Sequence, residues 1–511
     1  MLPELIAALR GPQMLPFIGI SLVIYLITSY LAAWHRLRHF PGPALGSFSY
    51  LWMFRAGTSG LQSERYNLNK QYNSNLIRIG PNDLITDDPE IIRRMNGARS
   101  SYGRSSWYDA MKMDPYGHCL FDLTDTAAHD RLKARLAFGY GGKENPHLER
   151  DIDDQVLSFV DLIRRKYLSS DKTGEMQPLD FARTVSYFTL DAITKIAFGA
   201  PFGYLATDSD VYGYLHGIEV SVPILTVLAE IPMLCKIALS PWVLKLFGPR
   251  KTDEVGMGKM LAVAEQRVAE RFGPDAKDGQ DMLGAFVRHG VTRRQCEIEV
   301  PFQIIAGADT TATAIRATML YLATCRRAYE RLQREIDNAA AEGRISSPVT
   351  AAEGRGLEYL QAVIYEGLRM QVPFSGLLMK RVPPEGDTID GRFVPGGTRI
   401  AHNTLGLQRN TAIFGEDVDV FRPERWLDAD PAQRTVMVQT TEMVFGHGRW
   451  GCLGKPVAFV ELNKIYVELL RRFDFQLINA KRPWREHNAN LFFQSEMWMR
   501  VTERFPGNVQ G

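Results

Sequence analysis

The sequence predicts a mainly α-helical fold with a small β-sheet region, arranged as one large domain behind an N-terminal transmembrane helix. Apolar residues recur at the helical period of 3.6 along most of the chain, whereas strand-like alternation is confined to two short regions. After a proline-rich bend at residues 41–43, no internal repeat or low-complexity tract divides the chain. The expected helices are 132–138, 180–198, 300–322, 329–341, 358–370 and 455–473, and the expected strands lie in 76–79, 83–86, 387–393 and 398–401.

The N-terminal segment is predicted to cross a membrane. No charged side chain occurs in residues 11–34, and roughly 20 apolar residues at ~1.5 Å each span the hydrocarbon of a bilayer. The charges before this run, Glu4 and Arg10, nearly cancel, whereas a basic flank follows it. A cleaved signal peptide has its basic residues first, and a buried core helix seldom avoids charge for so long. We therefore expect an uncleaved anchor and basic flank in residues 1–40, with residues 41–511 in the cytosol.

Composition excludes several classes of protein. The chain is 45% hydrophobic and 23% charged with a formal net charge of +2, so neither a nucleic-acid binder nor an acidic tail is indicated. Its five cysteines form no CxxC pair, which fits a reducing compartment and offers no disulfide framework or structural zinc site. The ten histidines show no HExxH or paired-ligand spacing, so a histidine-based metal site is not supported.

A glycine-rich loop near the C-terminus places one cysteine at the start of a predicted helix. Residues 445–456 read FGHGRWGCLGKP, with Cys452 among four glycines. Glycine lets a backbone approach a flat ligand closely, and a thiolate at a helix amino end is stabilised by the helix dipole and by free N–H groups. Pro456 suits the first helical turn. Cys452 is therefore placed to act as a thiolate ligand; the alternative is a buried cysteine in a glycine-rich turn.

Upstream, small and polar residues interrupt an apolar helix, because segment 306–311 reads AGADTT. Gly307 costs about 1 kcal/mol relative to alanine inside a helix, which a flat cofactor pressing on this surface would explain. The Thr310 hydroxyl can donate to the carbonyl of Ala306, four residues back, and Asp309 adds an acid beside it. The alternative is an ordinary helix with an incidental pair of threonines.

Two further segments carry paired charges. Glu366 and Arg369 lie three residues apart and share a helix face, where a carboxylate and a guanidinium can form a bidentate pair. Alone this is weak evidence, because many solvated helices carry such pairs. Further along, segment 421–426 reads FRPERW and contributes Arg425.

Taken in order, these four segments resemble the cytochrome P450 family. The family's haem loop has the pattern Phe, two residues, Gly, one residue, Arg, one residue, Cys, one residue, Gly, which Phe445, Gly448, Cys452 and Gly454 match. The resemblance implies a cytochrome P450 fold in which these residues contact haem b and Cys452 is the axial ligand of its iron. Trp450 stands where the family usually has an arginine that holds a haem propionate, so that contact is left open.

The resemblance also assigns roles to the other segments. Asp309 and Thr310 correspond to the family's acid-alcohol pair, which delivers protons during oxygen cleavage, and are the expected catalytic residues. Glu366, Arg369 and Arg425 correspond to a cluster that locks the cysteine loop in place and has a folding role.

Three more residues are expected to contact the haem propionates. His129 and Lys133 lie on the helix that performs this role in the family, and Lys133 replaces the usual arginine with a group that cannot form a bidentate contact. Arg381 is the third candidate. A solvated surface charge is the alternative for both basic residues.

The implied reaction is an NADPH- and O₂-dependent monooxygenation. O₂ is the co-substrate, one oxygen atom enters an apolar small molecule, and electrons come from NADPH through NADPH-cytochrome P450 reductase. No GxGxxG in a βαβ setting and no flavin domain occurs in the sequence, so the reductase is expected as a separate partner. A basic face that includes Arg449 and Lys455 would receive it, at the cytosolic side of the endoplasmic reticulum membrane.

Only the resemblance to known proteins limits the range of expected substrates. Segments 388–397 and 421–427 look like those of filamentous-fungal P450s of the pisatin demethylase type, which implies hydroxylation, demethylation or ring oxidation in secondary-metabolite biosynthesis. Alternatives are a P450-fold isomerase or dehydratase, which typically lacks the acid-alcohol pair, a non-catalytic haem-binding sensor, and a membrane scaffold without a cofactor. Candidate pocket walls are residues 101–118, 204–247, 374–378 and 490–493.

Overall fold

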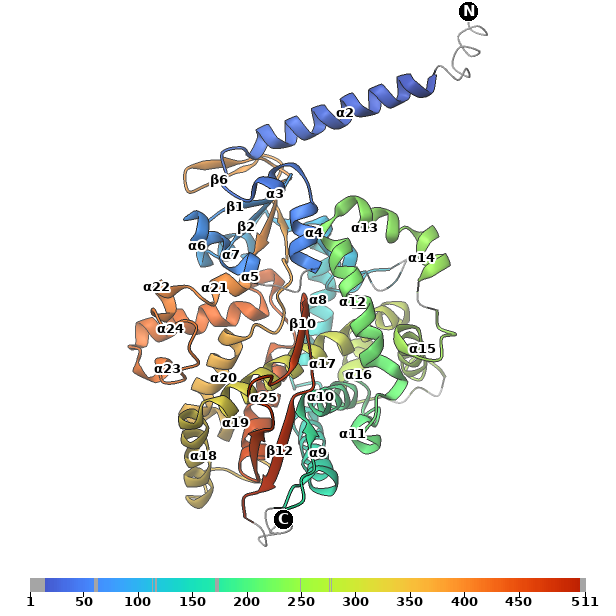
Figure 1. Cartoon of the computed structure of the whole chain (residues 1–511). Coiled ribbons are helices and arrows are strands. Elements are labelled where there is room, and N and C mark those ends of the chain that lie inside the picture. Colours follow the sequence, from blue (N-terminus) through green and yellow to red (C-terminus); the bar gives the residue numbers. More distant parts are fainter. Residues whose placement is uncertain are drawn as a thin grey trace, which may run out of the picture.

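The computed structural model describes residues 14–505 apart from 59–62, 113, 115–116, 171–173, 249, 275 and 277. Segments 1–13 and 506–511, which belong to the expected anchor and domain, lie outside the described residues. Figure 1 shows a body of packed helices edged by small sheets, from which helix α2 (Met14–Leu37) projects. The prediction of a mainly α-helical fold with a small β-sheet region is confirmed.

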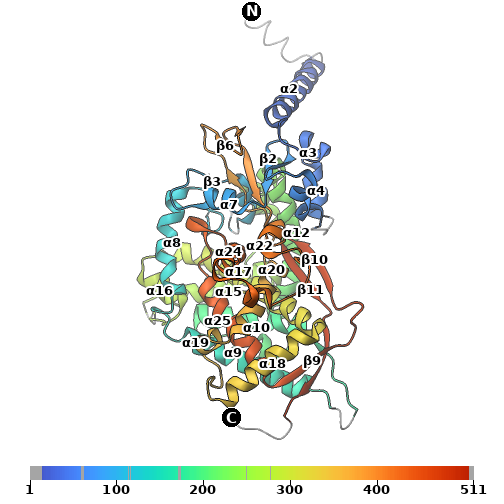
Figure 2. The same ribbon diagram turned by 90° about the vertical axis from the view of Figure 1, so that its left-hand side faces the viewer.

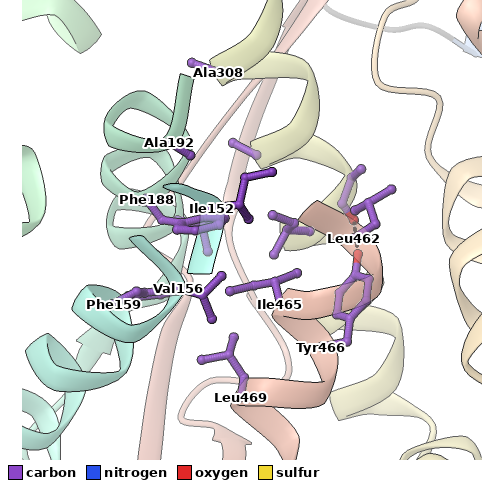
Figure 3. Close-up of a cluster of buried hydrophobic side chains, with 14 of the residues drawn as sticks. Ile152, Val156, Phe159, Phe188, Ala192, Ala308, Leu462, Ile465, Tyr466 and Leu469 are labelled. Atoms are coloured by element: carbon purple, nitrogen blue, oxygen red, sulfur yellow. Dashed lines mark hydrogen bonds between the residues drawn. The ribbon is translucent and has the colours of Figure 1, made fainter. Parts of the chain in front are cut away.

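Four helices form the centre of the fold: α9 (Leu148–Leu162), α10 (Phe181–Phe198), α17 (Arg293–Thr324) and α25 (Lys455–Leu470). Helix α17 packs against α10 and α25, and α9 packs against the same two helices. Each large apolar side chain buried there contributes about 1.5–3 kcal/mol, so this core holds the helices in fixed positions. The side chains that meet in it include Ile152, Val156, Phe159, Phe188, Ala192, Ala308, Leu462, Ile465 and Leu469 (Figure 3).

Caps decide where these helices begin and end. Thr292 accepts a hydrogen bond from the Gln295 N–H at 3.3 Å, so α17 begins before the predicted 300–322. Helix α10 ends at Gly199, whose left-handed φ of 80° suits a glycine. Helix α25 ends three residues before the predicted end, because the chain turns into a strand there.

The main sheet contains every strand segment predicted from the sequence except the hairpin described next. Strands β2 and β8 run parallel, with Leu84 opposite Ile400, and the other neighbouring strands run antiparallel. This sheet carries β5 and β3 toward the cysteine loop. Its strand order is β1 (Ile77–Gly80), β2 (Asp83–Thr86), β8 (Arg399–His402), β5 (Lys380–Arg381) and β3 (Gly103–Arg104).

A hairpin joins β6 (Asp387–Ile389) to β7 (Arg392–Val394). Its turn residues Asp390 and Gly391 both have positive φ, 49° and 71°, as a two-residue Asp-Gly turn requires. The C-terminal strands were not predicted, and of these β10 reads REHNA, which lacks the alternation of a half-buried strand. Strands β12 (Trp498–Glu503) and β9 (Phe473–Leu477) form a sheet with β4 (Leu179–Asp180), in the order β4, β12, β9. Strands β10 (Arg485–Ala489) and β11 (Leu491–Ser495) form a separate hairpin.

The other helices surround this frame, and Figure 2 shows α2 leaving the body at the end that carries the main sheet. The remaining helices are α3 (Ala44–Phe48), α4 (Leu51–Thr58), α5 (Ser63–Tyr66), α6 (Leu68–Tyr72), α7 (Pro89–Asn96), α8 (Thr126–Tyr140), α11 (Tyr204–Thr207), α12 (Tyr214–Glu230), α13 (Pro232–Ala238), α14 (Pro241–Phe247), α15 (Gly256–Ala269), α16 (Met282–Arg288), α18 (Arg326–Ala341), α19 (Ala351–Arg355), α20 (Glu358–Met370), α21 (Thr404–Leu407), α22 (Thr411–Phe414), α23 (Arg425–Asp428) and α24 (Pro431–Thr441). The short 3₁₀ helices are η1 (Ser106–Met111), η3 (Val211–Gly213), η4 (Glu442–Phe445) and η5 (Gly448–Trp450), and η2 (Ile163–Tyr167) is a π-helix.

Helix α2 stands clear of the body, but its last turns are fastened to it. The guanidinium of Arg78 on β1, itself only 1% exposed, donates to the carbonyls of Ala33 at 2.9 Å and Trp34 at 3.1 Å. By length and composition, residues 19–37 are apolar enough to cross a bilayer, and so is a second described stretch, residues 211–230. The helix expected from the sequence is therefore present, with its exit from the body fixed by a buried arginine.

Candidate active site

The cysteine loop enters α25 through a tight turn. The Cys452 N–H donates to the Phe445 carbonyl at 2.7 Å, and η5 precedes the cysteine. The Cys452 side chain remains accessible, although the protein surrounds it closely enough that burial raises the pKa of its thiol. The N–H groups of Gly454 and Lys455 at the start of α25 lower this pKa in turn. These donors partly offset the effect of burial and favour the thiolate that a metal ion would bind.

The loop glycines serve the backbone as well as any ligand. Gly448 has a φ of 55°, and a Cβ added there would lie 2.3 Å from the Asn96 carbonyl of α7. Any larger residue would push the cysteine loop away from α7. A Cβ on Gly454 would reach 3.7 Å from the Cys452 sulfur, so this glycine leaves the space beside the thiol open.

The acid-alcohol pair lies within the continuous helix α17. The Thr310 hydroxyl donates to the Ala306 carbonyl at 2.7 Å, which confirms the hydrogen bond expected from the sequence. Burial raises the pKa of the Asp309 carboxyl to about 6, while a hydrogen bond from Tyr214 and the charge of Arg316 oppose the rise. Asp309 is therefore a carboxyl that can take up and release a proton near neutral pH.

Gly307 has a packing role that was not inferred from the sequence. A Cβ at this position would lie 2.8 Å from two carbons of the Ile193 side chain on α10. The glycine therefore allows α10 and α17 to pack closely, whether or not a flat cofactor presses on the same helix.

The charge cluster behind the loop has the predicted members. The Arg369 guanidinium makes two hydrogen bonds to Glu366, at 2.9 and 2.8 Å, and Arg425 Nε donates to the same carboxylate at 3.0 Å. Trp426 Nε1 adds a hydrogen bond at 3.0 Å that sequence reasoning missed. All these groups are buried, so a carboxylate with this many donors keeps its pKa lowered and stays ionised.

Trp450 is surrounded by cations. The Lys380 ammonium lies 4.2 Å and the Arg104 guanidinium 4.5 Å from its ring centre, within the range of cation-π attraction. The His129 ring lies 4.3 Å from the same indole. Lys133 donates to the carbonyls of Arg449 at 2.7 Å and Gly451 at 2.6 Å. The structure thus brings His129 and Lys133 to the cysteine loop, and their expected contact with the haem propionates stays a prediction.

Three buried donors in this cluster have no hydrogen-bond partner among the described residues: Arg104 Nε, Lys380 Nζ and Trp450 Nε1. A buried donor without a partner costs about 1–3 kcal/mol, more when it is charged. Burial together with the charges of Arg104 and Lys133 lowers the pKa of Lys380 well below its usual value. A dianionic group placed here would satisfy these donors, so the residues fit the two propionates of a haem beside Cys452.

Arg381 is not brought to this cluster. Successive residues of a strand point to opposite faces, and on β5 it is Lys380 that is buried while Arg381 is exposed. Sequence reasoning missed Lys380 and Arg104. The alternation along β5 could have indicated Lys380, whereas nothing in the local sequence singles out Arg104.

The chain is similar to known proteins over most of its length. The family profile of cytochrome P450 matches residues 41–497. Cytochrome P450 monooxygenase ABA1 of Pyricularia oryzae is 52% identical, covering 94% of this chain and 95% of that protein, and aba1 of Botryotinia fuckeliana is 43% identical, covering 91% and 92%. The crystal structure of the cytochrome P450DA heme domain has a TM-score of 0.72 at 17% identity, covering 91% of this chain and 98% of that chain.

The chain belongs to the cytochrome P450 family. It is a P450 monooxygenase, an oxidoreductase of a family that works with haem and O₂.

Proposed function

We propose that the protein inserts one atom of O₂ into an apolar small molecule, with Cys452 as the axial ligand of a haem b iron. The observation that carries this proposal is the accessible thiol at the amino end of α25, next to three buried donors that have no hydrogen-bond partner in the part of the chain that the structure describes. A thiolate-ligated haem supplies the O–O cleavage chemistry of the family. Gly448 and Gly454 shape the loop, and Phe445 accepts the Cys452 N–H.

The protein's own groups then orient the cofactor and handle protons. Arg104, Lys380 and Trp450 replace Arg381 as candidates for the propionate contacts, together with His129 and Lys133. Asp309 and Thr310 are the proposed catalytic pair, because the acid titrates near neutrality and the alcohol follows it on α17. The isomerase, dehydratase and sensor alternatives do not require this pair.

The substrate is proposed to be an apolar secondary metabolite of a fungus. Two of the pocket walls expected from the sequence contribute Tyr108 and Phe374 to an aromatic group around Phe121, which stacks on Phe302 of α17 at 5.1 Å and meets Phe374 edge-on at 6.2 Å. Tyr108 packs on Phe121 at 5.3 Å. Such rings favour an unsaturated or cyclic hydrocarbon skeleton, and hydroxylation, demethylation and ring oxidation all suit it.

Electrons are proposed to come from NADPH through a separate reductase that docks beside the cysteine loop. The two cations expected at this face are engaged, since Lys455 pairs with Glu442 at 2.7 Å and Arg449 with Asp130 at 3.2 Å. Both remain partly exposed, so an acidic partner surface can still reach them.

The proposed location is the endoplasmic reticulum membrane, with residues 1–40 as anchor and 41–511 as cytosolic catalytic domain. The exposed helix α2 supports the anchor. A second support is an apolar surface on α13 and α14, where Met233 is 72%, Trp242 70% and Phe247 81% exposed. An exposed apolar surface of this kind suits contact with lipid.

The test is the absorption spectrum of the reduced, carbon monoxide-bound protein in microsomes. We expect the strongly red-shifted Soret band of thiolate ligation in the wild type and in Cys325→Ala, a control at another partly accessible cysteine. Cys452→Ala should lose the band. A normal band in Cys452→Ala would exclude it as ligand, and the lack of NADPH- and O₂-dependent turnover in haem-loaded protein would favour the isomerase or the sensor.

A further inference from the structure

A polar pocket connects the surface with the Asp309 carboxylate. Its volume is about 290 Å³, and its walls come from α10, α12, α17 and β11. His216 and Glu219 line it as exposed residues, whereas Asp309 and Arg316 line it as buried ones, 8% and 4% exposed. The pocket therefore leads from solvent toward the acid of the acid-alcohol pair.

Tyr214 holds the acid at the buried part of this pocket. Its hydroxyl donates to Asp309 Oδ2 at 2.9 Å, and the tyrosine itself is only 1% exposed. It is the first residue of α12 and follows Tyr212 and Gly213, whose φ values of 64° and 61° are both left-handed. This turn fixes the direction in which α12 starts.

The charges that face Asp309 come from several elements. Arg316 on α17 and Glu219 on α12 act on it electrostatically. Arg316 is occupied by the carbonyls of Ala312 at 3.0 Å and Gln494 at 3.1 Å. Of the described residues, Tyr214 is the one whose side chain forms a hydrogen bond with the Asp309 carboxylate. Asp180, Arg183 and Asp210 also line the pocket.

We propose, on the basis of the monooxygenase function above, that Tyr214 is a positioning residue that holds Asp309 at the inner end of this pocket, and that the protons of the reaction enter from solvent there. The reaction RH + O₂ + 2 e⁻ + 2 H⁺ → ROH + H₂O consumes two protons per O₂. Asp309 takes them from water in the pocket and passes them toward Thr310, the next residue of α17.

The physical reasons are the position and the acidity of the carboxyl. Asp309 is buried, so it exchanges protons with solvent only where water reaches it, and the pocket is such a place. With a pKa of about 6 it changes protonation readily near neutral pH. A hydrogen bond from a tyrosine favours the carboxylate and keeps it turned toward α12, ready to accept the next proton.

Tyr214→Phe removes only the hydroxyl, and Tyr359→Phe is its matched control. Tyr359 on α20 is likewise a buried tyrosine, and its hydroxyl donates to a different carboxylate, Glu424 Oε1, at 2.9 Å. With NADPH-cytochrome P450 reductase, Tyr214→Phe should move the acid limb of the pH profile of NADPH oxidation up by about one pH unit, the effect of one lost hydrogen bond. It should also release several-fold more H₂O₂ per NADPH, while the control matches the wild type.

Infrared difference spectra provide a readout that does not depend on turnover. The carboxyl band that Asp309→Asn removes should titrate at higher pH in Tyr214→Phe than in the wild type.

Ser186→Leu, which fills the pocket from α10, should raise the solvent isotope effect on NADPH oxidation. Each variant is first checked for the red-shifted carbon monoxide band. A wild type without that band overturns the proposed function, whereas normal bands with an unchanged carboxyl titration and pH profile overturn this inference alone.

Discussion

The ammonium group of Lys380 lies 4.2 Å from the centre of the Trp450 indole ring. Trp450 occupies the place where the family pattern has an arginine. In this chain Lys380 and Arg104 therefore contact an aromatic ring at this position, and the family pattern would place a third positive charge there. The exchange reduces the repulsion among cations while leaving an indole N–H free to donate. Under the proposed function, Lys380 and Arg104, which the local sequence does not reveal, would compensate for this departure from the family pattern.

Trp450→Ala should lower the retention of haem, and Trp450→Phe should lower it less. The alanine variant loses both the π surface and the N–H donor, whereas phenylalanine keeps the surface. We expect the alanine change to cost about 3–5 kcal/mol in the folded protein. The rate of haem transfer to apomyoglobin and the thermal midpoint measure both effects. Trp498→Ala, at a tryptophan that is 42% exposed, is the control, and equal haem transfer in all three variants would exclude the contact.

Lys380→Met should stabilise the haem-free protein and weaken the binding of haem. The pKa of this buried ammonium is lowered because burial and neighbouring cations disfavour its charge, so removing it stabilises the haem-free protein. The same change removes a propionate donor and weakens haem binding. Arg381→Met, on the exposed side of β5, should do neither. Denaturant unfolding of both forms tests this, and a stronger effect from Arg381→Met would restore the expectation drawn from the sequence.

Local patterns predicted the groups whose partners lie within a few residues. Glu366 and Arg369 share a helix turn, and Thr310 reaches a carbonyl one turn back, so both relationships follow from helix geometry. The contact of Tyr214 with Asp309 joins residues 95 positions apart, and no periodicity encodes such a pairing. The packing of Gly307 against Ile193 on another helix was missed for a similar reason.

Glu366→Gln should destabilise the protein by about 3–5 kcal/mol, because it leaves two buried guanidinium groups without their carboxylate. Glu330→Gln breaks an exposed pair with Arg326 and should cost less than about 0.5 kcal/mol. Urea unfolding and the yield of haem-loaded protein measure the difference. Similar losses in the two variants would show that the cluster behind the cysteine loop contributes little to the fold.

As pH rises, the wild type should lose stability relative to the variant Asp309→Asn. Burial raises the pKa of Asp309 from 3.8 to about 6, so between these values the folded protein holds a proton that the unfolded chain has released. Stability falls with pH wherever the folded state binds more protons. The free energy of unfolding of the wild type therefore falls by about 3 kcal/mol relative to that of the asparagine variant between pH 4 and 6, and it falls no further above that range. Urea unfolding at pH 4, 5, 6 and 7 gives the curve. A constant difference would mean that the carboxyl is already ionised at pH 4, and Asp309 would then be unable to exchange protons near neutral pH.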